Sequence, residues 1–359
     1  MVDDRDIARW RLRTQRLVAP HAHSAAEVVG GLLAVQAENA SQAGWAVACR
    51  TDKADPDDLA ALLDSGQVLR THVLRPTWHF VSAEDILWLL ELTAPRNQPV
   101  MSKQLEAEGY DDTAMARMTD AVLQALTDLG PLTRSGMSDA LRERGHELTG
   151  FQLMLLLGHI EFAALICSGP PLDGEHTYAL LPDRVPKPRR LERDEALAEL
   201  ALRYFTGHGP ATERDLAYWA TLTITDARKG LAQVREQLES FEHDGRTFWH
   251  APGQAPPKSD QHPTGHLVQI LDEMYRGYQD SRWVLDAERH VPRVRETAIG
   301  MALVDGQLVA GMKRTLSARA VTFELTPHRA LATSERTAIE KAASRYAGFL
   351  GLEPVLAYP

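Results

Sequence analysis

Apolar and polar positions alternate at helical spacing at the start of the chain and then give way to a strand-like run. The stretch 25–35 places its apolar residues on one helical face, and Ser24 stands before it with the spacing of a capping box. A second helix is predicted over 56–63. The run 67–81 is rich in β-branched and aromatic residues and is broken at Pro76, which predicts two short strands. Two helices followed by a strand pair is the order of a winged helix-turn-helix.

The same order recurs twice further along. The predicted elements are helices over 134–144, 149–166, 193–205, 213–220 and 225–234, a strand over 176–181 and a hairpin over 238–249. A Gly-Pro-x-Thr sequence starts a short helix in both later copies, at Gly130 and Gly209. Their spacing of about 80 residues is longer than a solenoid repeat and fits tandem small domains.

Beyond a proline-rich segment at 251–264 the pattern becomes β-rich. Strands are predicted over 267–271, 282–285, 298–304, 307–312 and 320–325, with a hairpin turn at 304–307 and a final helix over 334–350. We therefore expect an α+β, predominantly helical chain with three tandem winged helix-turn-helix units and a β-rich C-terminal domain. The expected boundaries are 1–100, 101–190, 191–255 and 265–359.

Composition agrees with a globular protein: 44% of the 359 residues are hydrophobic and 25% are charged. Cys49 and Cys167 match no zinc pattern and argue against a disulfide framework, so a reducing compartment is expected. No segment has 18 consecutive apolar residues, and the N-terminus lacks the apolar core of a signal peptide. These features predict a cytoplasmic protein with no membrane partner.

Charge alone argues against nucleic acid as a partner, because the formal net charge is −10. Its distribution changes that picture. The segment 282–319 carries seven Arg or Lys against four Asp or Glu, and five arginines precede Leu17. Basic runs beside winged-helix candidates keep DNA among the partners to be considered.

Two short clusters carry candidate chemistry. Gln36-Ala37-Glu38 follows the first apolar helix, and its two polar side chains can serve one site only where the helix has ended; the alternative is a solvated helix end. In the run 75–79, Arg75, Trp78 and His79 surround a proline and could approach a phosphate and a sugar. The alternative there is a core tryptophan beside a half-buried histidine.

Several enzyme classes lack their motifs here. The sequence has no phosphate-binding glycine loop with Lys, no dinucleotide fingerprint, no nucleophile elbow and no zinc-binding helix with paired histidines. This argues against a kinase, an ATPase, a metalloprotease and an α/β-hydrolase.

Taken together, five segments resemble the bacterial tandem winged-helix DNA glycosylases of the azinomycin-resistance type. They are Arg16-Leu17, 32–38 (LLAVQAE), 71–80 (THVLRPTWHF), 271–282 (LDEMYRGYQDSR) and 304–311 (VDGQLVAG). The resemblance implies three winged-helix units around a concave DNA-binding surface. It also implies excision of bulky N7-alkylated purines, including crosslinked ones in some members, in repair or in self-resistance to a genotoxic natural product.

The resemblance also implies a catalytic pair, Gln36 and Glu38. Family members carry Gln-x-Gln or Gln-x-Asp at this position, so Glu38 keeps the carboxylate of the second branch with a reach longer by about 1.5 Å. Glu38 is expected to stabilise an oxocarbenium-like sugar and to take a proton from the attacking water, which Gln36 orients.

Expected DNA contacts come from Arg75, Trp78 and His79 beside the lesion, from Arg282, and from a hairpin carrying Lys313 and Arg314. The expected partner is double-stranded DNA with an alkylated guanine or adenine, bound by a monomeric, monofunctional glycosylase at the nucleoid. No metal or cofactor is expected.

Two other readings of the sequence remain. A non-catalytic winged-helix transcriptional regulator predicts sequence-selective binding of intact duplex and indifference to Glu38. A drug-sequestering protein predicts tight binding of a free genotoxin without DNA.

Overall fold

Two segments of the chain repeat one order of elements: helix, strand, helix, helix, strand, strand. The computed structural model describes residues 2–257, 262–269, 271–292 and 300–358. The first copy consists of α2 (Ala25–Leu32), β1 (Ala34–Gln36), α3 (Ala40–Ala48), α4 (Pro56–Ser65), β2 (Val68–His72) and β3 (Trp78–Ser82). The second consists of α6 (Asp112–Leu129), β4 (Leu132–Thr133), α7 (Arg134–Glu143), α8 (Gly150–Phe162), β5 (Ile166–Ser168) and β6 (Thr177–Leu180). In both sheets the last strand lies in the middle, in the orders β1-β3-β2 and β4-β6-β5.

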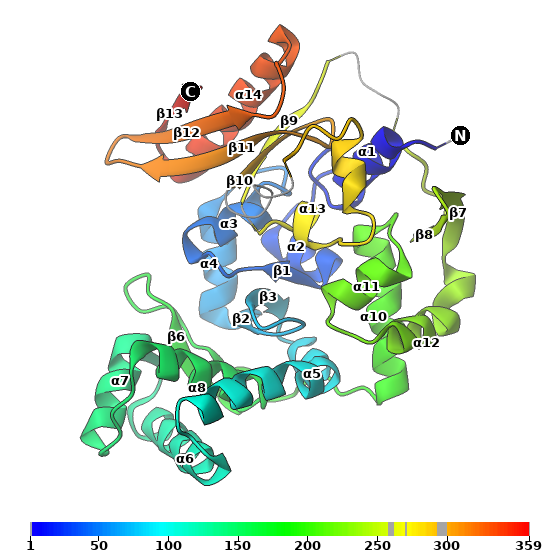
Figure 1. The fold of residues 1–359 in the computed structure, drawn as a ribbon. Helices are drawn as coiled ribbons and strands as arrows, with labels where there is room; N and C mark the ends of the chain where they lie inside the picture. Colours follow the sequence, from blue (N-terminus) through cyan, green and yellow to red (C-terminus); the bar gives the residue numbers. More distant parts are fainter. Residues whose placement is uncertain (1, 258–261, 270, 293–299, 359) are drawn as a thin grey trace.

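A third segment follows the same order with a shortened first strand. It contains α10 (Arg193–His208), α11 (Glu213–Trp219), α12 (Ile224–Val234), β7 (Glu239–His243) and β8 (Arg246–His250). A single bridge between Ala211 and Trp249 occupies the place of the first strand. The first copy lies at the centre of the molecule in Figure 1, with the second copy below it and the third segment beside it.

A five-stranded sheet closes the chain, in the order β13-β12-β11-β10-β9. Its strands are β9 (Gly265–Val268), β10 (Gly300–Val304), β11 (Gln307–Leu316), β12 (Ala320–Pro327) and β13 (Glu353–Ala357), and α14 (Thr333–Leu350) precedes the last of them. Trp45 of α3 stacks on Tyr346 of α14 with ring centroids 4.2 Å apart, which joins this part to the first copy. Strands β11 and β12 extend outward beyond the rest of the sheet (Figure 1).

The remaining elements connect these parts. They are α1 (Asp4–Thr14), α5 (Ile86–Ala107), α9 (Leu181–Arg184), α13 (Glu273–Arg276) and the 3-10 helices η1 (Arg235–Gln237) and η2 (Arg282–Asp286). The fold is thus α+β, with more residues in helices than in strands. No helix within the described ranges is long and apolar enough to cross a membrane.

Several predicted elements are confirmed and others need correction. The hairpins around Asp244-Gly245 and Asp305-Gly306 form as predicted. The third-segment helix begins at Ile224, because Thr223 and not Thr225 caps it. The first segment is followed by the long helix α5, which runs from Ile86 to Ala107. It continues because its apolar face packs against α8, where the absent side chain of Gly158 leaves room for Met101.

The predicted strand 282–285 is wrong, since these residues form η2. No neighbouring strand meets their main chain. Instead the Gln307 side chain donates to the Val284 carbonyl at 3.0 Å and accepts from the Ala287 N–H at 3.0 Å. Residues 270, 298 and 299 of two other predicted strands lie outside the described residues, as do Arg293 and Arg295 of the basic segment.

The arginine run of α1 is largely used inside the protein. Arg11 is fully buried and donates to the Pro210 carbonyl at 2.9 Å and to the Ser281 hydroxyl at 2.6 Å. Arg9 pairs with Asp6, and Arg5 pairs with Glu288. Arg5 and Arg11 therefore bind α1 to the fold, and Arg9 is neutralised within the helix, so none of the three forms a free basic surface.

Candidate active site

The Gln36–Glu38 segment is extended because helix α2 ends early. The Ser24 hydroxyl caps the start of α2, and Leu33 leaves the helix at its end with φ of 66°. The helix predicted over 25–35 therefore stops at Leu32, and β1 pairs with β3 so that Gln36 lies opposite His79. Strand β1 ends at Gln36, and Glu38 lies two residues beyond it in a bend, where its main chain meets the Gln36 side chain.

The Gln36 amide has a defined orientation. Its Oε1 accepts the main-chain N–H of Glu38 at 2.9 Å. A main-chain N–H can only donate, so the atom facing it is the oxygen, and Nε2 points the other way. No described residue accepts a hydrogen bond from Nε2, and that amide group is not among the buried unpartnered atoms. Gln36 therefore offers a free donor although only 2% of the residue is exposed.

The Glu38 carboxylate lies at the surface beside this donor. Its Oε2 accepts the main-chain N–H of Trp78 at 3.1 Å, and the residue is exposed. The hydrogen bond orients the carboxylate and leaves Oε1 available to a ligand. An amide donor and a carboxylate acceptor thus stand side by side at the end of β1.

The outer edge of β1 is held by side chains from the C-terminal part of the chain. Gln269 Nε2 donates to the Gln36 carbonyl at 2.9 Å, and the Gln36 N–H donates to Glu273 Oε1 at 3.0 Å. An edge strand otherwise leaves such groups unpaired, and burying them unpaired is costly. These two side chains therefore fix the main chain of Gln36.

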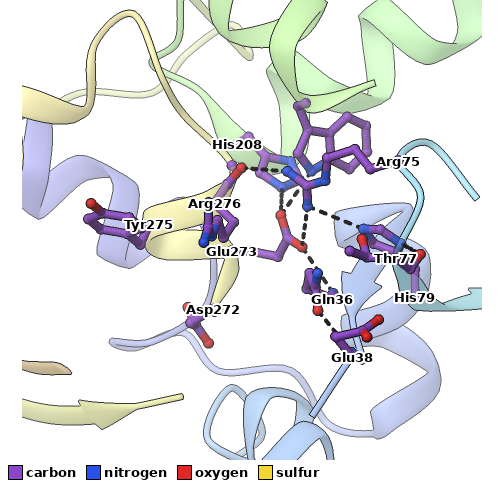
Figure 2. Close-up of polar contacts among 12 residues, drawn as sticks. Gln36, Glu38, Arg75, Thr77, His79, His208, Asp272, Glu273, Tyr275 and Arg276 are labelled. Carbon is purple, nitrogen blue, oxygen red and sulfur yellow. Dashed lines mark hydrogen bonds and ion pairs between the residues drawn. The ribbon is translucent and has the colours of Figure 1, made fainter. Parts of the chain in front are cut away.

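Glu273 is the centre of a buried polar network (Figure 2). Its Oε2 accepts the Trp219 indole N–H at 2.8 Å, His208 Nε2 lies 3.4 Å from the same oxygen, and Arg75 Nη2 lies 4.0 Å from Oε1. Burial by itself raises the pKa of Glu273, but the contact with His208 and the charge of Arg75 outweigh it and lower the pKa to about 2. The carboxylate is therefore ionised at neutral pH.

His79 is fully buried and supports Arg75. Its Nε2 accepts from Arg75 Nη2 at 3.2 Å, which leaves Nδ1 to donate to the Thr77 carbonyl at 2.9 Å. Burial, aided by the charge of Arg75, lowers the pKa of His79 to about 3, so the ring is neutral at physiological pH. A direct contact between His79 and DNA does not fit this burial.

Trp78 stands half-buried at the start of β3, between charged groups. Its indole N–H donates to the buried Glu161 at 3.2 Å, and Glu161 also bonds His72. The Arg70 guanidinium lies 4.2 Å from the Trp78 ring centroid and donates from Nε to the Ala37 carbonyl at 3.1 Å. Trp78 and Arg70 therefore hold the segment 36–38 through the Trp78 N–H bond to Glu38 and the Arg70 bond to the Ala37 carbonyl.

Two more predicted DNA contacts lie on β11. Lys313 is exposed and lies 3.6 Å from Glu324 on β12. Arg314 donates to the Tyr346 hydroxyl at 2.9 Å and to the Ser41 hydroxyl at 3.0 Å. Ser41 follows Glu38 by three residues, so Arg314 reaches the candidate site and Lys313 faces away from it.

Arg282 lies in η2. Its Nε donates to the carbonyls of Tyr275 and Tyr278, at 3.0 and 2.8 Å. These bonds hold its guanidinium in place.

Four side chains that shape the site were not assigned a role from the sequence: Arg70, Glu161, Gln269 and Glu273. Glu273 stood within the segment 271–282 that carries the family resemblance, and Arg70 within the first predicted strand pair. Glu161 and Gln269 carried no local signal, because their partners are distant in sequence.

Comparison with known proteins agrees with a DNA-repair enzyme of this architecture. The family model described as DNA glycosylase AlkZ-like matches residues 29–349. The chain therefore belongs to the AlkZ-like DNA glycosylases.

A relative and a solved structure extend the match. The chain is 24% identical over 261 residues to the interstrand DNA cross-link repair glycosylase of Streptomyces sahachiroi, a match that covers 67% of this chain and 68% of that protein. The structure of Streptomyces sahachiroi DNA glycosylase AlkZ superposes with a TM-score of 0.77 over 99% of both chains, at 21% identity. At 21% identity, the match to the solved structure shows a shared fold.

Proposed function

We propose that this DNA glycosylase hydrolyses the N-glycosidic bond of bulky N7-alkylated purines in double-stranded DNA, with Gln36 and Glu38 as the catalytic pair. The observation that carries the proposal is the Gln36 amide: its Oε1 binds the main-chain N–H of the exposed Glu38, and its Nε2 has no hydrogen-bond partner among the described residues. The Streptomyces relative is an interstrand DNA cross-link repair glycosylase, which supports including interstrand crosslinks among the substrates.

The chemistry suits this pair. N7-alkylation makes the purine cationic, so the base leaves with the electron pair of the bond between C1′ and N9 without a strong general acid. The sugar becomes oxocarbenium-like, and a water adds its oxygen to C1′. Gln36 Nε2 donates to a lone pair of that water, and Glu38 Oε1 takes its proton and offsets the positive charge of the sugar. Gln36 and Glu38 supply no amine nucleophile, which supports a monofunctional enzyme.

The open position of Glu38 supports a bulky substrate. Many glycosylases flip the base into a tight pocket, which a large adduct could not enter. Cavities of about 480 and 600 Å³ lie against α1, and neither is lined by Gln36 or Glu38. A surface site lets the protein approach the sugar while the adduct stays outside.

The repeated topology supports DNA as the partner. We propose that the three segments are winged-helix units with the boundaries expected from the sequence, in a monomeric, cytoplasmic protein at the nucleoid. Arg75, Trp78, Arg282, Lys313 and Arg314 contact the DNA, and His79 acts through Arg75.

The test is direct. Duplex DNA with a single N7-alkylguanine is incubated with the protein, and abasic sites are counted by alkaline cleavage. Accumulation of abasic sites, with release of the free alkylated base, is expected. Specific binding of intact duplex without abasic sites would instead indicate a regulator, and binding of the free genotoxin alone would indicate a drug-sequestering protein.

A further inference from the structure

The helices that usually enter a DNA groove are poorly suited to phosphate here. The last helix before the hairpin is α4 in the first segment, and it carries Asp57 and Asp58 in its first turn. In the third segment, the cations of α12 are already paired: Arg228 with Glu213, and Lys229 with Asp194. In a chain of net charge −10, phosphate contacts must therefore come from cations that are not neutralised.

Three arginines gather around one half-buried hydroxyl, that of Tyr218 on α11. The guanidinium carbons of Arg75 and Arg282 lie 5.8 and 5.7 Å from the Tyr218 ring centroid, and Arg282 Nη2 lies 3.4 Å from the hydroxyl. Burial raises the pKa of Tyr218, but the charges of Arg75, Arg276 and Arg282 outweigh it and lower the pKa below its ordinary value. Arg276 belongs to the same cluster, because its carbonyl accepts from Arg75 Nη1 at 2.9 Å and it follows Tyr275 in α13.

The cluster is short of negative charge. In the part of the chain that the structure describes, neither Arg276 nor Arg282 forms an ion pair, and Arg75 has only Glu273, at 4.0 Å. Arg276 Nε is buried without a hydrogen-bond partner. Of the three guanidinium groups, only that of Arg75 has a carboxylate partner among the described residues, and an anion is the group that would complete the other two.

The cluster is also held in a fixed geometry. Arg75 Nη1 donates to the Arg276 carbonyl at 2.9 Å, and the Arg282 guanidinium lies 4.1 Å from the Tyr275 ring centroid. Little side-chain entropy therefore remains to be lost on binding.

Direct contacts connect the cluster to the candidate active site. The Gln36 N–H bonds Glu273, Glu273 faces Arg75, and Arg75 lies against Tyr218. An anion bound at the cluster would therefore sit a few side chains from the Gln36–Glu38 pair, within reach of the sugar-phosphate chain that carries the damaged base.

We propose that Tyr218, Arg276 and Arg282 form a binding site for a backbone phosphate of the DNA substrate. Arg75 completes the positive field and remains bound to Glu273. The proposal rests on the proposed function, since it assigns the site to the strand that carries the damaged base. This phosphate contact fixes the register of the strand, so that C1′ of the damaged nucleotide faces Glu38.

The test compares Arg276→Gln and Tyr218→Phe with Arg336→Gln as matched control. Arg336 also lies over a tyrosine, 4.8 Å from the Tyr358 ring centroid, but outside the cluster. Dissociation constants are measured over a series of salt concentrations with lesion-bearing and intact duplex. Melting temperature and circular dichroism report folding.

Arg276→Gln is expected to weaken binding of both duplexes by the same factor and to reduce the slope of log K against log salt by about 1. Tyr218→Phe is expected to weaken binding without changing that slope, because no charge is lost. Arg336→Gln is expected to behave as wild type.

An unchanged slope in folded Arg276→Gln protein would overturn the proposal. A second result would also overturn it. If inorganic phosphate at constant ionic strength raised the melting temperature of wild type but not of Arg276→Gln, and the salt slope with DNA were the same for both, the site would hold a free anion and not a DNA phosphate. Binding of intact duplex does not depend on base release. A failure of the proposed chemistry is therefore seen separately, as absence of abasic sites with wild-type protein.

Discussion

The main-chain N–H of Glu38 donates to Oε1 of Gln36 at 2.9 Å, so the two residues of the proposed catalytic pair orient each other. This bond decides which end of the amide faces the substrate. It also ties the position of the carboxylate to the identity of the residue two places before it. The next two predictions follow from this relationship.

Gln36→Glu is expected to lower the rate of base release about 100-fold, as loss of one preorganised donor does. A carboxylate can still accept the Glu38 N–H, but it offers no donor to the water. Single-turnover release of the alkylated base measures the effect. Gln36→Ala is the companion variant, and a Gln36→Glu enzyme as fast as wild type would remove the amide donor from the mechanism.

Glu38→Gln is expected to lower the single-turnover rate by about 10²–10⁴-fold, because it removes the base that takes the proton of the water. DNA binding should persist, since the amide can still accept the Trp78 N–H. Glu340→Gln on the exposed face of α14 is the matched control. Wild-type rates in Glu38→Gln would refute the catalytic assignment.

Acid pH is expected to destabilise the fold well before the carboxylates titrate. Burial lowers the pKa of His79, His176 and His266 to about 3, whereas the same groups titrate near 6.5 when unfolded. Unfolding therefore takes up protons between these values, and the free energy of unfolding falls as the pH drops from 6.5 toward 3.

Urea unfolding at a series of pH values measures this slope. His266→Gln should reduce the proton uptake by about one. Equal slopes in wild type and His266→Gln would contradict the prediction.

Lys313→Ala is expected to weaken DNA binding and to reduce the salt slope by about 1, since Lys313 is exposed on the projecting β11–β12 hairpin. Arg314→Ala is expected to lower the rate of base release as well, because Arg314 bonds Ser41 beside the candidate site. Binding titrations and single-turnover kinetics separate the two effects. The assignment of the hairpin to DNA would fail if both variants kept the wild-type salt slope.

Local signals were enough to predict much of this fold. The Ser24 cap, the Asp244-Gly245 turn and the strands around Pro76 all form where the residue types indicate. Interactions over long sequence distances were not predictable in the same way. The segment 282–285 looks like a strand and becomes η2, because the side chain of Gln307 binds its main chain in place of a neighbouring strand.

In the candidate site, too, local motifs could be predicted from the sequence and long-range contacts could not. Gln36 and Glu38 were found from a short motif, but their geometry depends on Glu273. Its partners lie on three separate elements and in the loop between β2 and β3. His79 was expected to contact DNA because of the family motif and the local charge. Its burial follows from the packing of Arg75 and Glu273 around it, which no local pattern records.

The two hydrogen bonds on the outer edge of β1 have a consequence for the synthesis and folding of the protein. The residues that hold the Gln36 main chain lie 233 and 237 positions further along the chain. A ribosome therefore releases the Gln36–Glu38 segment long before it synthesises the residues that fix it, and contacts of such sequence separation form late in folding. A chain that ends before Glu273 has the motif but lacks the contacts that fix it, so we expect no base excision from it.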